Sequence, residues 1–173
     1  MTTLDGDLGH SDTSFFPSLL LIFLSPHPAR IPIWARLSGQ EYTHAVAMIG
    51  DYIWDQPIDG KGACYEAEEW MGAANVDERD AVFVILPGRD ADPEATLRAF
   101  RKVAGRRGQR IRTMLRFLRL WPFRPWNCTS PIRILAGAYG LPLTGETPDD
   151  LIEEVTRILL SPERDPGNVP TGS

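Results

Sequence analysis

The order of hydrophobic patterns along the chain constrains its fold more than any single motif. Short apolar runs bounded by turn residues, which are typical of strands, occupy the first half, including 19–24 and 80–88. From Asp92 onward the apolar residues recur with a helical period instead. Strands followed by helices, with no internal repeat, predict an α+β fold with a small antiparallel sheet and helices packed on it. The run at 80–88 is expected to be a buried strand that Pro87 terminates.

The composition is that of one globular domain. The 173 residues are 43% hydrophobic and 24% charged, which is enough apolar material for a real core. We place this domain at 14–160, between a flexible polar N-terminus at 1–13 and a disordered tail at 161–173. The apolar stretch 14–24 follows acidic residues rather than Lys or Arg. It is also shorter than the roughly 20 residues that a membrane span needs, so we expect neither a signal peptide nor a transmembrane segment.

Four helices are predicted in the second half, at about 93–104, 109–121, 129–139 and 147–160. The first has Asp92 as its N-cap and ends at Gly105, and the fourth opens with a T-x-x-D capping pattern at Thr147. The second is basic and amphipathic, and we expect its apolar face to join the core, namely Ile111, Met114, Leu115 and Leu118.

A predicted β-hairpin brings a histidine and a carboxylate together. If Gly50-Asp51 forms a two-residue turn, for which Gly in the first position suits type II′, then Ile49 pairs with Tyr52. Side chains alternate along a strand, so His44 and Asp55 fall on the same face as diagonal neighbours, with backbones roughly 7–8 Å apart. An imidazole with a carboxylate behind it is the base-and-orienter pair of nucleophilic catalysis. The alternative is a strand histidine with an incidental acidic neighbour.

Cys128 stands in "RPWNCTSPIRIL", between two polar residues and just ahead of a helical pattern. Unpaired backbone N–H groups and the positive end of the helix dipole favour an anionic thiolate at such a position. The backbone N–H of Cys128 is also placed to help hold an oxyanion. Asn127 is expected to cap the helix. The bland alternative is a cysteine that begins a helix without any chemical role.

These residues carry a resemblance to a known group. "IPIWARLSGQEYTHAVAMIGDYIWD" and, far downstream, "WNCTSPIRILAGAYGL" resemble the circularly permuted papain-like proteins of the NlpC-type superfamily, which includes lecithin retinol acyltransferase. In that group a Ser/Thr-His strand comes first, a polar residue follows on the next strand, and the cysteine comes last at the head of a helix. "TPDDL" after a Gly-Leu-Pro stretch resembles the end of small permuted members from bacteria and phages.

The resemblance implies a permuted papain-like fold and a cysteine hydrolase, either an amidase or peptidase or an esterase or acyltransferase. Its triad would be Cys128 as nucleophile, His44 as base and Asp55 as the orienting residue, with no cofactor. Glu66, in "CYEAEEW", remains a second choice for the third residue because it resembles the "YEA" of some permuted members. Amides or esters of cell-wall peptides or lipids are the implied substrates, in a cytoplasmic or phage-associated protein.

Other residues carry weaker signals. Cys64 is expected to pack within an extended stretch, Tyr42 is expected to be a core residue rather than an oxyanion donor, and Ser130 lacks a nucleophile elbow. The two cysteines form no CxxC pair and the three histidines show no ligand spacing, so we expect neither a disulfide framework nor a metal site.

The charge is distributed unevenly. Residues 95–145 contain eleven of the chain's 18 basic residues and no Asp or Glu, although the net charge is −5. One interpretation is a solvated helical face that answers acidic neighbours within the fold. The other is a site for an anionic ligand along the Arg98–Arg124 segment, such as a nucleic acid or an anionic lipid, because Arg alternates there with aromatic residues. A non-catalytic structural or binding protein of the same fold, for instance a phage virion component, is the remaining alternative to an enzyme.

Overall fold

A computed structural model describes residues 16–88, 91–117, 120 and 122–161. The flexible N-terminus expected at 1–13 lies outside the described residues, as does the expected tail beyond residue 161. The described chain is α+β, with one antiparallel five-stranded sheet in the order β4-β3-β2-β1-β5, as the sequence predicts. The strands are β1 (Leu19–Leu24), β2 (His44–Ile49), β3 (Tyr52–Asp55), β4 (Ala63–Glu66) and β5 (Ala81–Leu86).

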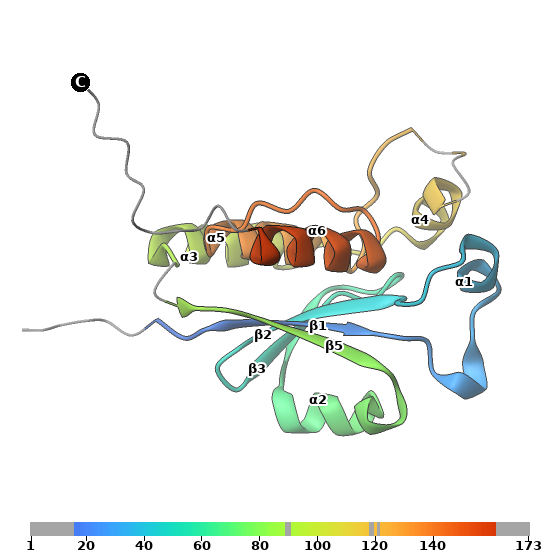
Figure 1. Ribbon diagram of the computed structural model, residues 1–173, viewed down its shortest axis with the longest axis horizontal. Coiled ribbons are helices and arrows are strands. Elements are labelled where there is room, and N and C mark those ends of the chain that lie inside the picture. The colour runs from blue at the N-terminus through green and yellow to red at the C-terminus, as the bar shows by residue number, and fades with distance from the viewer. Residues whose placement is uncertain (1–15, 89–90, 118–119, 121, 162–173) are drawn as a thin grey trace, which may run out of the picture.

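Helices lie on both faces of this sheet. Figure 1 shows α3, α5 and α6 on one face and α2 on the opposite face, with α1 and α4 toward one end of the sheet. The helices are α1 (Ile33–Ser38), α2 (Ala67–Ala73), α3 (Pro93–Val103), α4 (Arg110–Phe117), α5 (Thr129–Ala138) and α6 (Pro148–Leu160). Short 3₁₀ turns occur at Pro28–Arg30 and Val76–Glu78.

Strand β1 is covered on both faces, which explains its uninterrupted apolar sequence LLLIFL. Leu19, Leu21 and Phe23 belong to the larger core cluster, together with residues of α3, α5 and α6. Ile22 and Leu24 point the other way into a smaller cluster that includes Trp70 of α2. Packing on both faces therefore holds β1 in place, and the strands that are hydrogen-bonded to β1 are positioned with it.

The β2–β3 hairpin forms as predicted. Ile49 is paired with Tyr52, and Gly50 has a φ of 57°, whereas Asp51 is not among the described residues with a positive φ. A positive φ at the first turn position alone is the signature of a type II′ turn. The turn therefore sets the register that determines which side chains of β2 and β3 share a face.

The prediction that 80–88 is a fully buried strand is wrong in part. β5 lies at the edge of the sheet, where Phe83 is 52% exposed and Ile85 65% exposed. Both side chains are on the same face as Ile22, since Phe83 is paired with Ile22. The short helix α2 packs on this face against β3 and β4 and leaves the far edge uncovered.

The helix ends follow the capping signals in the sequence. The Asp92 carboxylate accepts hydrogen bonds from the backbone N–H groups of Glu94 and Ala95 at the start of α3. Thr147 and Asp150 form a complete capping box at the start of α6. Gly105 and Gly140 have φ values of 69° and 74°, in the left-handed region that ends helices.

Helix α4 faces the protein differently from the prediction. Ile111 is 75% exposed, Thr113 is buried and Met114 and Leu115 are half-buried. Leu118 lies outside the described residues. Thr113 and Arg116 are three residues apart and share a face of the helix. The ion pair of Arg116 with Glu146 holds that face against the protein, so Ile111 on the other side is left in solvent.

Candidate active site

His44 opens β2 and Asp55 ends β3, so the two residues lie on neighbouring strands of the sheet. The Nε2 atom of His44 and the Oδ1 atom of Asp55 are 2.8 Å apart and hydrogen-bonded. The side chains are 23% and 19% exposed, which shields the pair from most of the solvent. The predicted geometry is therefore confirmed: the two side chains share a face and reach each other.

Trp70 of α2 binds the Asp55 carboxylate. Its indole N–H donates a hydrogen bond of 2.8 Å to Oδ2, the second oxygen of the Asp55 carboxylate. Burial alone would raise the pKa of Asp55, but the hydrogen bond and charge of His44 and the hydrogen bond from Trp70 outweigh it and lower this pKa. Both oxygens of the carboxylate are thus engaged, and the carboxylate is held in one orientation.

Trp70 is a site residue that no sequence motif identifies. The residue comes from α2, on the face of the sheet opposite α5, and is 7% exposed. Its only sequence signal is a single aromatic residue after three acidic ones in "EAEEWM". That pattern predicts a core-facing side chain but does not identify its hydrogen-bond acceptor.

Cys128 is the N-cap residue of α5, with a partly buried side chain. Its side chain lies beside that of His44 and raises the pKa of this histidine. Because Asp55 engages Nε2, the ring nitrogen left for the thiol is Nδ1. The backbone N–H of Cys128 has no hydrogen-bond acceptor within the part of the chain that the structure describes. The structure therefore brings all three predicted site residues together, with His44 hydrogen-bonded to Asp55 and beside Cys128.

The electrostatics of His44 reflect both neighbours. Burial disfavours the charged imidazolium, but hydrogen bonds to Asp55 and Cys128 and the negative charges of these partners raise the pKa of His44 to about 10. Since that value is above neutrality, His44 carries a positive charge at neutral pH, between a carboxylate and a cysteine.

Asn127 organises the start of α5, as predicted. Its Oδ1 atom accepts hydrogen bonds from the backbone N–H of Thr129, at 3.2 Å, and from the Thr129 hydroxyl, at 2.7 Å. The hydroxyl of Ser130 also donates to it, at 3.2 Å. All three side chains are buried. Ser130 is therefore part of the structural network around the cysteine rather than an exposed nucleophile.

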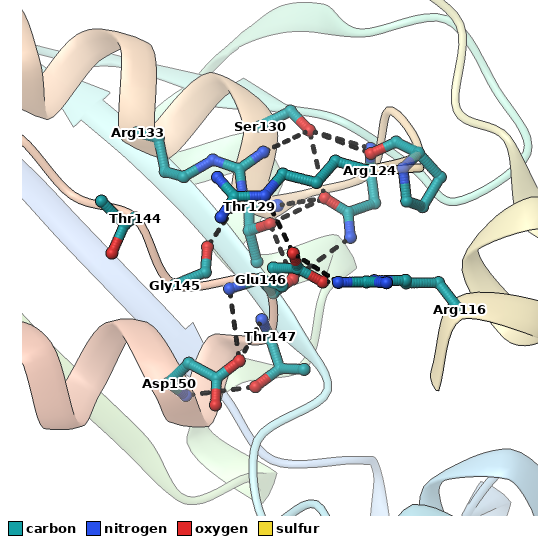
Figure 2. Close-up of polar contacts among 12 residues, drawn as sticks. Arg116, Arg124, Thr129, Ser130, Arg133, Thr144, Gly145, Glu146, Thr147 and Asp150 are labelled. Carbon is teal, nitrogen blue, oxygen red and sulfur yellow. Dashed lines mark hydrogen bonds and ion pairs between the residues drawn. The ribbon is translucent and has the colours of Figure 1, made fainter. Parts of the chain in front are cut away.

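A loop at residues 144–147 accepts hydrogen bonds from this network (Figure 2). The backbone carbonyl of Glu146 accepts hydrogen bonds from the Thr129 hydroxyl, at 3.0 Å, and from the Asn127 amide, at 3.4 Å. Arg133, one turn further along α5, donates to the Gly145 carbonyl at 2.9 Å. The first turn of α5 is thus fixed to a loop that comes after it in the chain.

Two arginines clamp the Glu146 side chain in the same region (Figure 2). Arg116 donates two hydrogen bonds to its carboxylate, at 2.6 and 2.9 Å, and Arg124 donates one at 2.8 Å. Hydrogen bonding to Arg116 outweighs partial burial and lowers the pKa of Glu146. The carboxylate therefore stays ionised and ties α4 and the segment before Cys128 to the 144–147 loop.

Other arginines of the basic segment also lie beside acids. Arg98 contacts Glu94 at 3.2 Å and Asp92 at 3.7 Å, and Arg110 contacts Asp59 at 3.5 Å. These contacts favour the interpretation in which the basic segment forms ion pairs with acidic residues of the same fold.

A second tie positions the segment before Cys128. The indole N–H of Trp126 donates to Oε1 of Gln56 at 2.9 Å, and the Gln56 amide donates to the carbonyls of Pro57 and Gly60, both at 3.1 Å. Gln56 follows Asp55 directly and is 1% exposed. This pair, which no sequence motif identifies either, links the end of β3 to the nucleophile segment.

The remaining candidates are placed away from the chain of hydrogen bonds. Glu66 is exposed and paired with Tyr52, three residues before Asp55, so it lies on the opposite face of the hairpin. Tyr42 packs against the larger core cluster, as expected. The expectation that Cys64 packs in the interior is wrong, because its side chain is exposed on the edge strand β4.

A cavity of about 390 Å³ adjoins the site on the side of α2. His44, Asp55 and Trp70 line it, together with Tyr65, Glu69, Ala73, Ala74 and Arg79. A larger cavity of about 770 Å³, lined by residues of α1 and the start of α6, contains none of the three candidate residues. The smaller cavity therefore borders the His44–Asp55 pair, and Cys128 is not among the residues that line it.

Within the described ranges, no group of three His, Cys, Asp or Glu side chains is arranged to hold a metal ion. None of the described helices combines the length and hydrophobicity needed to cross a bilayer.

Comparison with family models, curated proteins and solved structures gives no match to this chain.

Proposed function

We propose that this protein is a cysteine hydrolase or acyltransferase that acts on an amide or ester. The observation that carries the proposal is the hydrogen-bonded series Trp70–Asp55–His44, with Cys128 beside His44. A nucleophile, a base within reach and a third group that orients the base are the parts that covalent catalysis requires.

The fold proposed for it is the circularly permuted papain-like fold. In its favour, the histidine and the acid lie on adjacent antiparallel strands, and the cysteine follows at the start of a helix packed on the sheet. The chain order of histidine, acid and late cysteine agrees with the permuted arrangement.

In the first half of the reaction, His44 already carries its proton as an imidazolium, and Cys128 attacks the substrate carbonyl carbon as the thiolate of this ion pair. A carbon–sulfur bond forms, and the carbonyl electrons move to oxygen, where the backbone N–H of Cys128 donates to the oxyanion. His44 then gives its proton to the leaving amine or alcohol as the scissile bond breaks. Asp55 keeps the imidazole oriented and stabilises its charged form throughout.

In the second half, His44 takes a proton from water, or from another acceptor nucleophile, as that nucleophile attacks the thioester. The new carbon–oxygen or carbon–nitrogen bond forms, and the carbon–sulfur bond breaks. Cys128 leaves as the thiolate and His44 keeps the proton, which restores the starting ion pair.

The test compares the two cysteines of the same molecule with a fluorescent iodoacetamide at neutral pH. Burial raises the pKa of Cys64, with partial compensation by a backbone hydrogen bond, so little thiolate forms there despite its exposure. We expect Cys128 to react at least about tenfold faster than Cys64, because only the thiolate is the nucleophile. In His44→Gln the labelling of Cys128 should fall while that of Cys64 is unchanged. Equal rates at the two cysteines in both proteins would refute the catalytic assignment.

A further inference from the structure

Arg79 lies next to the candidate active site and forms no ion pair with a carboxylate of the described residues. It follows the Val76–Glu78 turn in extended conformation, and its side chain is partly buried. Its Nε atom donates to the carbonyl of Ser25 at 2.7 Å, which fixes the guanidinium at the end of β1. The two terminal nitrogens have no hydrogen-bond partner among the described residues.

The charge of Arg79 lacks a direct acidic contact among the described residues, although Glu41, Asp77, Glu78 and Asp80 line a second cavity together with it. Within the described part of the chain it forms no ion pair, whereas Arg98, Arg110 and Arg116 each contact an acid. Burial is the sole influence on the pKa of Arg79 and lowers it, with no acidic neighbour acting against burial. A partly buried cation without a partner is costly for a fold to retain. Its cost is offset where a ligand supplies the missing anion.

The position of Arg79 identifies which ligand would meet it. Arg79 lines the cavity of about 390 Å³ that also contains His44 and Asp55. Tyr65 and Trp70 contribute aromatic surface to the same cavity, which suits the carbon skeleton of an organic molecule. A molecule that fills this cavity therefore borders both His44 and Arg79.

We propose that this cavity binds the part of the substrate that carries a carboxylate, and that Arg79 receives that carboxylate while Cys128 attacks the amide or ester. The proposal rests on the function proposed above and adds the substrate class. With Nε held by Ser25, the terminal nitrogens of Arg79 remain to donate to carboxylate oxygens. Glu69 and Asp55 line the same cavity, and their negative charges favour a singly charged carboxylate over a doubly charged phosphate.

The experiment uses alkylating probes in matched pairs, one acid and one neutral amide. The pairs are iodoacetate with iodoacetamide, N-iodoacetylglycine with its amide, and N-iodoacetyl-β-alanine with its amide. In each reaction Cys128 sulfur attacks the methylene carbon, the carbon–sulfur bond forms and iodide leaves. The measured quantity is the ratio of the acid rate to the amide rate at Cys128, determined by mass spectrometry of the peptide.

In the wild type we expect the acid-to-amide ratio to be highest for the one acid whose length lets its carboxylate reach Arg79. Arg79→Met should lower that highest ratio about tenfold, the scale of one charge-assisted hydrogen bond. Arg79→Lys should keep part of it. Arg98→Met, which removes the same charge from an exposed site on α3, is the control and should leave the ratio unchanged.

Two outcomes would overturn the proposal. One is a ratio that does not depend on probe length, and the other is an equal ratio in the wild type, Arg79→Met and Arg98→Met. If Arg79→Met does not fold, protection of the wild-type Cys128 from iodoacetamide by succinate but not by succinamide decides the question. Equal protection by both compounds, or by neither, refutes it. Failure of the proposed function has a different signature, because Cys128 would then react with neutral iodoacetamide no faster than Cys64.

Discussion

Nε2 of His44 and Oδ1 of Asp55 are 2.8 Å apart, although the two residues belong to different strands. The tight turn at Gly50 sets the hairpin register, and the register determines that both side chains point to the same face. The second carboxylate oxygen is held by Trp70 from the other side of the site. A histidine fixed in this way has one nitrogen committed to Asp55 and the other available to Cys128.

Replacing Asp55 by Asn should lower the pKa of His44. The value of about 10 depends on the hydrogen bond and charge of Asp55, and burial alone would lower the pKa. NMR titration of the imidazole C–H signals measures it, with His44→Gln used to assign the His44 signal. A midpoint that stays near 10 in Asp55→Asn would show that Asp55 does not control this charge.

Stability should depend on the charge of His44 in a defined pH range. The pKa of His44 is about 10 in the folded protein, whereas a histidine without these interactions has a pKa of 6.5. Because the folded value is the higher one, the stabilisation is complete below about pH 6.5 and is lost as pH rises toward 10. Urea unfolding at a series of pH values should show the wild type losing free energy of unfolding relative to His44→Gln across this range. A constant difference between the two proteins from pH 6.5 to 10 would contradict the prediction.

Replacing Trp70 by Phe should impair the site while keeping most of the packing. The change removes the N–H donor to Asp55, raises the pKa of that carboxyl and leaves its second oxygen without this partner. We expect slower alkylation of Cys128 and a loss of roughly 1–2 kcal/mol in the free energy of unfolding.

Trp54→Phe is the matched control for Trp70→Phe. The Trp54 indole N–H is buried and has no acceptor within the described chain, so removing it breaks no hydrogen bond. The control should therefore alkylate at the wild-type rate. Equal alkylation rates in the two variants would show that the donor to Asp55 is unimportant.

Gln56→Leu should destabilise the segment before Cys128. The substitution removes the hydrogen bonds of the Gln56 side chain to the Trp126 indole N–H and to the carbonyls of Pro57 and Gly60, although the Gly60 carbonyl keeps its bond from the Gly108 N–H. A polar group that loses its partner away from solvent costs roughly 1–3 kcal/mol. A double-mutant cycle with Trp126→Phe, measured by urea unfolding, isolates the Gln56–Trp126 interaction. Additive effects of the two changes would mean that the 2.9 Å contact contributes nothing to stability.

Local patterns predicted much of the fold because they depend on nearby residues. The turn at Gly50, the N-cap Asp92 and the capping box at Thr147 each operate within four residues, and all form as expected. The placement of Cys128 at the start of α5 has the same local origin.

Predictions that depended on what covers a surface were less accurate. Ile111 was assigned to the core from its helical period, but Arg116 binds Glu146, 30 positions later, and turns another face of α4 inward. Phe83 was assigned to a buried strand, but α2 is too short to cover the β5 edge. Hydrophobic period indicates which residues share a face and does not indicate which face finds a partner.

Local sequence patterns were thus sufficient to predict the α+β class, the hairpin that joins His44 to Asp55 and the helix that Cys128 begins. The packing of the folded chain was needed to show that Cys128 lies beside His44, that Trp70 binds Asp55 and that Arg79 lines the same cavity without an ion pair to a described acid. The difference comes from separation along the chain. Contacts within a turn or a hairpin follow from local geometry, whereas contacts between remote segments depend on how the helices pack on the two faces of the sheet.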